Sequence, residues 1–104
     1  MTIKIEFDPA KDALNWELHK VHLSTAALVF ADPCRIERLD DSGSNVSGEE
    51  RIQTLGKVDK VLFIVYTERG EKTRLISARP ANAAEKRSYY GTDRNNRKGW
   101  TKAD

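Results

Sequence analysis

The sequence predicts an α+β domain: a small antiparallel sheet of about four to five strands, two N-terminal helices and one C-terminal helix, in the order β-α-α-β-β-β-β-α. Three features support this prediction. Apolar and polar residues alternate in several short segments, as is typical of strands. Capping residues precede segments with helical apolar spacing. The later strands are joined by short connections, which favour antiparallel pairing.

The first helix is the best-marked element of the N-terminal half. Residues 3–7 alternate in polarity and predict a strand directly before it. Asp8 is a strong N-cap, and Pro9 suits the first helical position because its missing N–H is not needed there. A helix is therefore expected from Pro9 to about His19. Its spacing puts one apolar set on one side: Ala10, Ala13, Leu14 and Leu18.

A second, shorter helix is expected before the sheet continues. Ser24 can cap its N-terminus, and Pro33 ends it. Residues 35–39 form a weakly patterned strand. The stretch from 40 to 48, rich in Asp, Ser and Gly, predicts a loop inside the domain.

The second half predicts three strands and a helix. The strands are expected at 50–56, 61–69 and 72–79, and the middle one is apolar on both faces, as in the centre of a sheet. Asn82 and Glu85 have the spacing of a capping box for a helix that ends at Tyr90, with Gly91 after it. We expect a single domain over residues 1–90 and a polar, mobile tail over residues 91–104.

The composition excludes several classes of protein. The chain has 104 residues and one cysteine, so it has neither an intrachain disulfide nor a site made of several cysteines. Its N-terminus lacks a signal-peptide pattern, and its longest apolar run is too short to cross a bilayer. We expect a soluble cytoplasmic protein with no membrane contact, and no cofactor is predicted.

Charge is distributed unevenly along the chain. Residues 1–68 hold 8 Lys/Arg and 12 Asp/Glu, whereas residues 69–104 hold 10 Lys/Arg and 4 Asp/Glu. A basic C-terminal third suits a surface that binds phosphate. A solvated helix and tail with surplus cations would give the same pattern.

Four stretches of the sequence resemble the BrnT family of bacterial toxins, and they occur in the family's order between residue 7 and about residue 90. No single stretch is specific, but together they are. They are Phe7-Asp8-Pro9-Ala10-Lys11 with Asn15 and His19; Phe30-Ala31-Asp32-Pro33; Gly48-Glu49-Glu50-Arg51 with Thr54-Leu55-Gly56; and Thr67-Glu68-Arg69-Gly70 with Arg74, Ile76-Ser77-Ala78-Arg79, Glu85 and Tyr89.

The resemblance implies a RelE-like fold and the toxin role of a type II toxin–antitoxin system. It implies a metal-independent endoribonuclease that inhibits translation. It also implies a BrnA-type antitoxin that binds the toxin in a hetero-oligomer, with operator DNA bound only through the antitoxin. The chain departs from the family at Leu18-His19-Lys20, where Lys-His-Gly is frequent. This change removes a glycine from the turn after the first helix.

Metal-independent RNA cleavage needs a base for the 2′-OH, cations for the phosphate and an acid for the leaving oxygen. Arginine suits phosphate because its planar fork stays charged. On the family match, the candidate catalytic residues are Arg51, Arg69, Arg79, His19 and Glu50. The candidate RNA-binding residues are Lys11, Arg74 and Tyr89.

Each candidate also has a structural interpretation. The arginines can pair with neighbouring carboxylates such as Glu50, Glu68 or Glu85, and Lys11 with Asp8. His19 can bond a backbone carbonyl, and Tyr89 can pack in the core. The alternative function is a non-catalytic module that binds RNA or protein, a toxin fold that has lost activity. Direct DNA binding ranks last, because the second helix lacks arginine and lysine.

Overall fold

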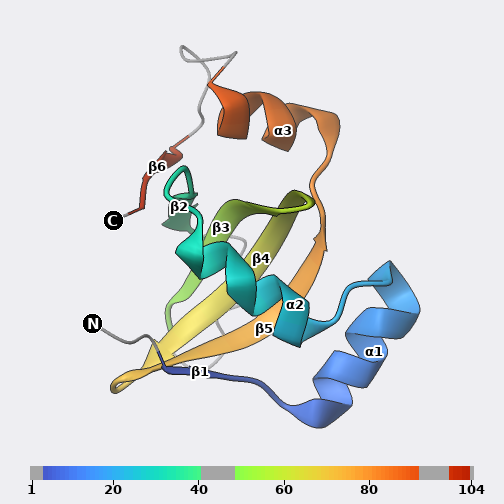
Figure 1. Ribbon diagram of the computed structural model, residues 1–104. Helices are drawn as coiled ribbons and strands as arrows, with labels where there is room; N and C mark the ends of the chain where they lie inside the picture. Colours follow the sequence, from blue (N-terminus) through green and yellow to red (C-terminus); the bar gives the residue numbers. More distant parts are fainter. Residues whose placement is uncertain (1–3, 41–48, 92–98, 104) are drawn as a thin grey trace.

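A computed structural model describes residues 4–40, 49–91 and 99–103. Within these residues it contains three α-helices, a short 3₁₀ helix and six strands that form one sheet (Figure 1). In chain order the elements are β1 (Lys4–Glu6), α1 (Pro9–His19), α2 (Leu23–Ala26), η1 (Ala27–Ala31), β2 (Ile36–Leu39), β3 (Arg51–Val58), β4 (Lys60–Arg69), β5 (Lys72–Pro80), α3 (Ala83–Tyr90) and β6 (Thr101–Lys102).

The sheet has the strand order β1-β5-β4-β3-β2-β6. Strands β2 to β5 form the expected antiparallel series, with β4 in the interior. The prediction of a purely antiparallel sheet of four to five strands is wrong, because β1 pairs with β5 in parallel and β6 adds a sixth strand. β1 is followed by helices instead of a tight turn, so its direction is not tied to that of its neighbour.

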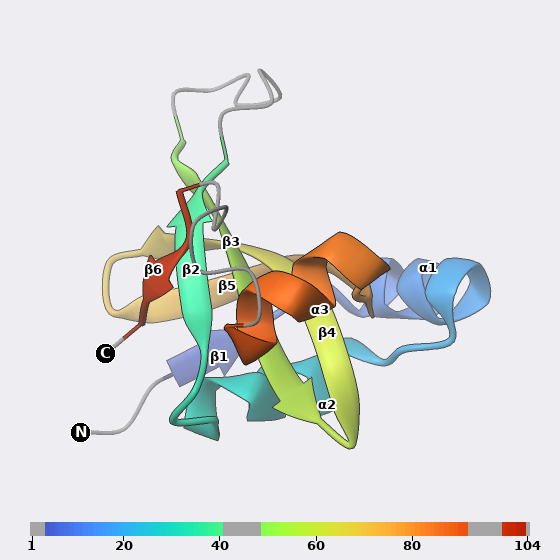
Figure 2. The same ribbon diagram turned by 90° about the horizontal axis from the view of Figure 1, so that it is seen from above.

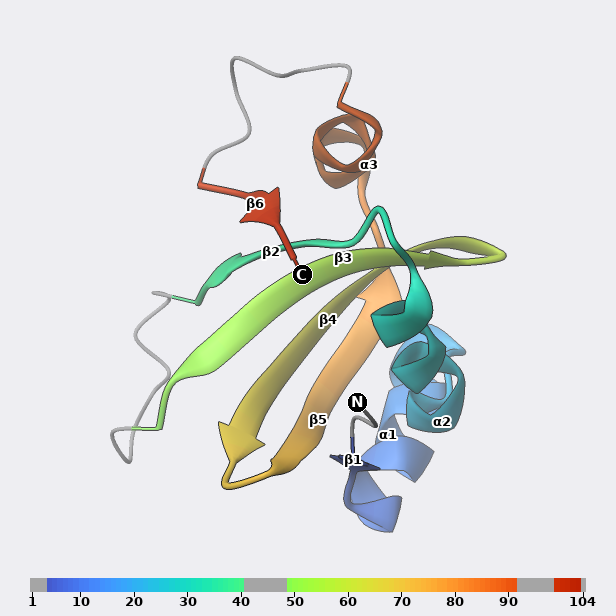
Figure 3. The same cartoon turned by 60° about the vertical axis from the view of Figure 1, so that its left-hand side comes forward.

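Helices cover the two faces of the sheet unequally. α2 lies on one face with α1 beside the β5 edge, and α3 lies towards one end of the other face (Figures 2 and 3). The first face carries the larger core, which includes Leu23, Val29, Ile64 and Leu75. The second carries a smaller core at the α3 end. It consists of Ile36, Leu55, Val61, Ala81 and Trp100, with Phe63 and Tyr89 packed against it.

The helix α1 has the predicted bounds and cap, since the Asp8 carboxylate accepts a hydrogen bond from Ala10 N–H. Its orientation differs from the expectation. Leu14 and Leu18 are 54% and 65% exposed, and the buried residue of the helix is Asn15. The apolar side of α1 therefore points away from the core.

Asn15 attaches α1 to the sheet through its amide. The side-chain nitrogen donates to the carbonyls of Val21 and Ala78, each at 2.8 Å, and the side-chain oxygen accepts from Ala78 N–H at 3.0 Å. β1 pairs with β5 only over 72–74, so the rest of that edge has no strand partner among the described residues. The amide of Asn15 replaces such a partner at Ala78.

The turn after α1 keeps the shape that a glycine would give it. Lys20 is the C-cap and has a φ of 57°, in the left-handed region. The next helix begins at Leu23, with His22 in the N-cap position two residues before the expected cap Ser24. The Asp12 carboxylate caps it instead of Ser24, since it accepts from Leu23 N–H at 2.7 Å.

The C-terminal elements agree in part with the sequence. The capping box of Asn82 and Glu85 is present, and Gly91 ends α3 with a φ of 72°. Residues 92–98 and 104, and the loop expected over 40–48 apart from Asp40, lie outside the described residues. The last part of the expected tail packs on the sheet: residues 101–102 form β6 and Trp100 is buried.

Gly56 permits the close approach of η1 to β3. A Cβ at this position would lie 2.6 Å from the Cβ of Val29, which is itself fully buried. We expect Gly56→Ala to lower the free energy of unfolding by about 2 kcal/mol, since two buried elements have to move apart. Urea denaturation measures this loss, and an unchanged free energy of unfolding would contradict the explanation.

Candidate functional site

The sheet face opposite α1 and α2 presents a group of arginines. Strand register places Arg51 of β3 beside Thr67 of β4, and Thr67 beside Arg74 of β5. Because directly paired residues point to the same face, these side chains form one row across three strands.

Two further rows continue this surface towards α3. Arg38 pairs with Gln53, Gln53 with Val65, and Val65 with Ser77. In the next row Arg79 pairs with Phe63. We call this surface the arginine face and define it by Arg38, Arg51, Arg74 and Arg79, which surround the smaller side chains of Gln53, Val65, Thr67 and Ser77.

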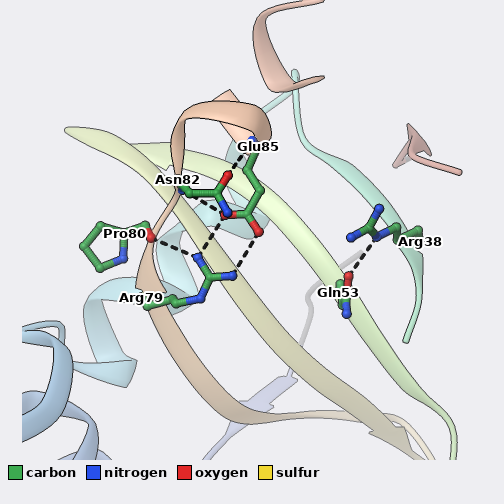
Figure 4. A network of polar contacts seen from close by, with 6 residues as sticks. All are labelled: Arg38, Gln53, Arg79, Pro80, Asn82 and Glu85. Atoms are coloured by element: carbon green, nitrogen blue, oxygen red, sulfur yellow. Dashed lines mark hydrogen bonds and ion pairs between the residues drawn. The ribbon is translucent and has the colours of Figure 1, made fainter. Parts of the chain in front are cut away.

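Arg79 is held rigidly on this face. Its guanidinium donates to both carboxylate oxygens of Glu85, at 2.9 Å each, and to the carbonyl of Pro80 (Figure 4). It also lies 4.0 Å from the centre of the Phe63 ring. The same Glu85 carboxylate accepts from Asn82 N–H at the start of α3. Arg79 thus confirms the expected pairing with Glu85, and its orientation is coupled to that of α3.

Arg38 is positioned from two sides. Its side chain donates to the Gln53 amide oxygen at 2.8 Å (Figure 4) and stacks 4.2 Å from the centre of the Trp100 ring. Gln53 in turn donates to the Asp40 carboxylate. The C-terminal segment around Trp100 therefore contributes to the arginine face by orienting Arg38.

The other arginines on this face of the sheet differ in whether a carboxylate pairs with them. Arg74 lies 3.4 Å from the Glu6 carboxylate. Arg69, farther along β4, is paired with Glu49 at 2.8 Å, and this hydrogen bond keeps the pKa of Glu49 below its usual value and raises that of Arg69. Within the described part of the chain, Arg51 forms no hydrogen bond or ion pair, although its positive charge helps to lower the pKa of Glu49.

His19 and Lys11 lie around the edge of the sheet, on α1. Together with Leu14, Leu18, Ile76 and Ser77 they line a hollow of about 180 Å³. Ser77 belongs to this hollow and to the arginine face, so the two surfaces meet at that residue. The structure therefore does not place His19 or Lys11 on the arginine face but beside it.

The remaining two candidates have other surroundings. Glu50 is exposed, and its backbone carbonyl accepts a hydrogen bond from the Thr67 hydroxyl at 2.7 Å. Tyr89 packs against the smaller core, and its hydroxyl donates to the Asp32 carboxylate at 2.6 Å. Burial and this hydrogen bond raise the pKa of Tyr89 above its usual value.

Asp32 connects three parts of the fold. Besides the Tyr89 hydroxyl of α3, its carboxylate accepts from Cys34 N–H and from Lys57 N–H, each at 2.8 Å. Burial alone would raise the pKa of Asp32, but the three hydrogen bonds and the charge of Arg35 outweigh it and keep the pKa below its usual value. Cys34 itself is exposed.

Asp32→Asn should destabilise the fold by about 2 kcal/mol at pH 7, because an amide replaces a charged acceptor of three hydrogen bonds. The pKa of Asp32 is lower in the folded state than in the unfolded state, where it is about 3.9. The stability that Asp32 contributes is therefore complete above about pH 3.9, and it is lost as the pH falls through the folded-state pKa. The difference between wild type and variant, measured by urea denaturation, should therefore shrink below about pH 4. A constant difference from pH 7 to pH 3 would contradict this.

Sequence reasoning missed Arg38 and the four side chains that the arginines surround, which are Gln53, Val65, Thr67 and Ser77. Strand alternation could have identified these four: Gln53 and Ser77 lie two residues from Arg51 and Arg79, Thr67 lies opposite Arg51, and Val65 lies opposite Gln53 and Ser77. Arg38 joins them only through the pairing of β2 with β3.

A family model described as the ribonuclease toxin BrnT of a type II toxin–antitoxin system matches residues 7–85. The chain belongs to the BrnT family. A search of curated proteins gives no match. Among solved structures, the crystal structure of the Brucella abortus ribonuclease toxin BrnT is similar, with a TM-score of 0.57 and 18% sequence identity. The alignment covers 78% of this chain and 99% of that one.

Two groups stand out among the residues that carry the BrnT resemblance. Asn15, Asp32 and Gly56 hold elements together, as their contacts show. The arginines at 51, 69, 74 and 79 all lie on the sheet face opposite α2. Among the described residues, no group of three or more His, Cys, Asp and Glu is arranged to hold a metal ion. None of the described helices is long and apolar enough to span a membrane.

Proposed function

We propose that this BrnT chain is a metal-independent endoribonuclease with a RelE-like arrangement that cuts cellular RNA in the cytoplasm and inhibits translation. A BrnA-type antitoxin neutralises it in a hetero-oligomer, and operator DNA is bound through the antitoxin alone. The family supports a ribonuclease toxin with an antitoxin partner. The observation that supports RNA cleavage is the arginine face, where guanidiniums from β2, β3 and β5 surround uncharged side chains.

The arginine face suits a phosphodiester in the act of cleavage. In this proposal the 2′-OH of the RNA attacks the adjacent phosphorus, the bond to the 5′ oxygen breaks, and a 2′,3′-cyclic phosphate forms. Negative charge grows on the phosphate oxygens in the transition state, and preorganised cations stabilise it. Arg51 donates hydrogen bonds to the charged phosphate oxygens. Arg74 and Arg79, which are held by carboxylates, stabilise the same charge through their positive electrostatic potential.

Proton transfer is assigned to residues at the margins of this surface. His19 is the imidazole candidate, and it lies beside Ser77 at the edge. Glu50, next to Arg51, is the second candidate. Arg69 adds charge at the far end of the face, and Lys11 and Tyr89 are proposed to contact the flanking nucleotides.

The test is induced expression of the chain without antitoxin in a bacterium, with growth and total RNA followed. Wild type should arrest growth and degrade RNA. Arg51→Ala should relieve both, while Lys60→Ala, which removes an exposed cation from the β3–β4 turn, should not. Normal growth with folded wild-type protein would contradict the proposal.

The non-catalytic alternative has one observation in its favour. Neither histidine of the chain, His19 or His22, lies on the arginine face. A protein of this second kind would bind RNA tightly and leave it intact. Incubating purified protein with labelled RNA separates the two functions, because gel shifts report binding and denaturing gels report cleavage.

A further inference from the structure

The outward side of α1 forms an apolar surface that no other described residue covers. Leu14 and Leu18 lie one turn apart and are more than half exposed. With Ile76, the extra residue at the bulge between β4 and β5, they line the hollow of about 180 Å³. A helix that exposes its leucines and buries an asparagine has its amphipathic sides reversed with respect to the core. Contiguous exposed apolar side chains of this kind mark contact surfaces for partners.

Lys11 places a positive charge at the rim of the same hollow. His19 also stands at its margin, and no aspartate or glutamate lines it. The apolar floor offers few hydrogen-bond donors to a nucleic acid, which needs contacts to phosphate and base edges. An apolar floor with a cationic rim instead complements a protein segment that is apolar on one side and acidic at its flanks.

We propose that this surface, the α1 patch (Lys11, Leu14, Leu18, His19 and Ile76), is the docking site for a helix of the antitoxin. The inference rests on the toxin–antitoxin pairing proposed above. The docked helix places apolar residues one turn apart between Leu14 and Leu18, which matches their own spacing. Its acidic side chains contact Lys11 and His19.

This placement also gives a way to neutralise the toxin. Ser77 lines the hollow and lies in a row with Val65 and Gln53 on the arginine face. A helix seated on the α1 patch therefore stands at the margin of the surface where RNA would lie. It encloses His19 at the same time, so the antitoxin removes one proton-transfer candidate from solvent.

The experiment uses the full-length chain and the antitoxin encoded in the same operon, titrated against each other by calorimetry. Leu14→Asp with Leu18→Asp should weaken the complex at least about a hundredfold, since two leucine side chains lose their burial and meet acidic flanks. Both residues are exposed in the free protein, so its melting temperature and RNA cleavage should stay close to wild type. Leu28→Asp is the matched control, because Leu28 is 60% exposed on η1 and lies outside the hollow.

Lys11→Glu tests the charge of the rim separately. It should weaken the complex about tenfold at low salt and less at high salt. The proposal is overturned if the double variant binds the antitoxin as wild type does, or if Leu28→Asp weakens binding equally. It is also overturned if the double variant loses RNA binding and keeps its antitoxin affinity. Failure of wild type to cleave RNA would contradict the proposed function and leave this binding result intact.

Discussion

Replacing Arg51 with alanine should reduce the rate of RNA cleavage by roughly 10²–10³-fold, the loss that follows removal of one preorganised donor to a transition-state oxyanion. Arg51 is singled out because its guanidinium has no hydrogen bond or ion pair within the described residues, whereas Arg79 and Arg69 are each bonded to a carboxylate. The effect should fall mainly on kcat, since the charge that Arg51 stabilises grows in the transition state.

Arg51→Lys distinguishes charge from geometry. Lysine keeps the positive charge but loses the planar fork, so we expect activity between that of wild type and that of Arg51→Ala. Single-turnover cleavage of a labelled RNA measures both variants, and melting curves confirm that they fold. Full activity of Arg51→Ala would remove Arg51 from the site and shift the chemistry to another part of the face.

Replacing Asn15 with alanine should lower the free energy of unfolding by about 3 kcal/mol, because three backbone groups lose a buried partner. For a domain of this size the melting temperature should fall by roughly 15 °C. The lost hydrogen bonds lie where α1 meets the edge of β5, because the Asn15 amide makes the bonds that a neighbouring strand would make there.

Leu14→Ala is the natural comparison for Asn15→Ala. Leucine is the more apolar residue and usually the more costly to truncate in a helix, but here Leu14 is 54% exposed and Asn15 is buried. Leu14→Ala should therefore change the melting temperature by only a few degrees. If Leu14→Ala were the more destabilising variant, α1 would have to be turned with its apolar side to the core.

Local chemistry made most of the elements predictable. Asp8-Pro9 and the pair Asn82 and Glu85 place the start of α1 and of α3, because a cap depends only on neighbouring residues. The orientation of α1 could not be predicted in this way. Apolar spacing indicates which residues share a side but not which side meets the core, and Asn15 reverses the usual choice through bonds to Ala78, far away in the chain.

The same distinction applies to the candidate site. Arg51 and Arg74 could be assigned to one surface once the strands were known, since alternation and register place them there. Arg38 could not, because the ring that orients it belongs to Trp100, near the chain end where a mobile tail is expected. His19 lies beside the arginine face and not on it, since α1 packs around the edge of β5.

We infer that the arginine face promotes attack of the RNA's own 2′-OH on the adjacent phosphorus, without a metal ion. The most direct measurement incubates the purified chain with a labelled RNA in excess EDTA and identifies the ends of the products. We expect cleavage that EDTA does not reduce, with 5′ fragments that end in a 2′,3′-cyclic phosphate. We expect no cleavage at a nucleotide whose 2′-OH is replaced by hydrogen. Cleavage that EDTA abolishes, or tight binding with every RNA left intact, would contradict it.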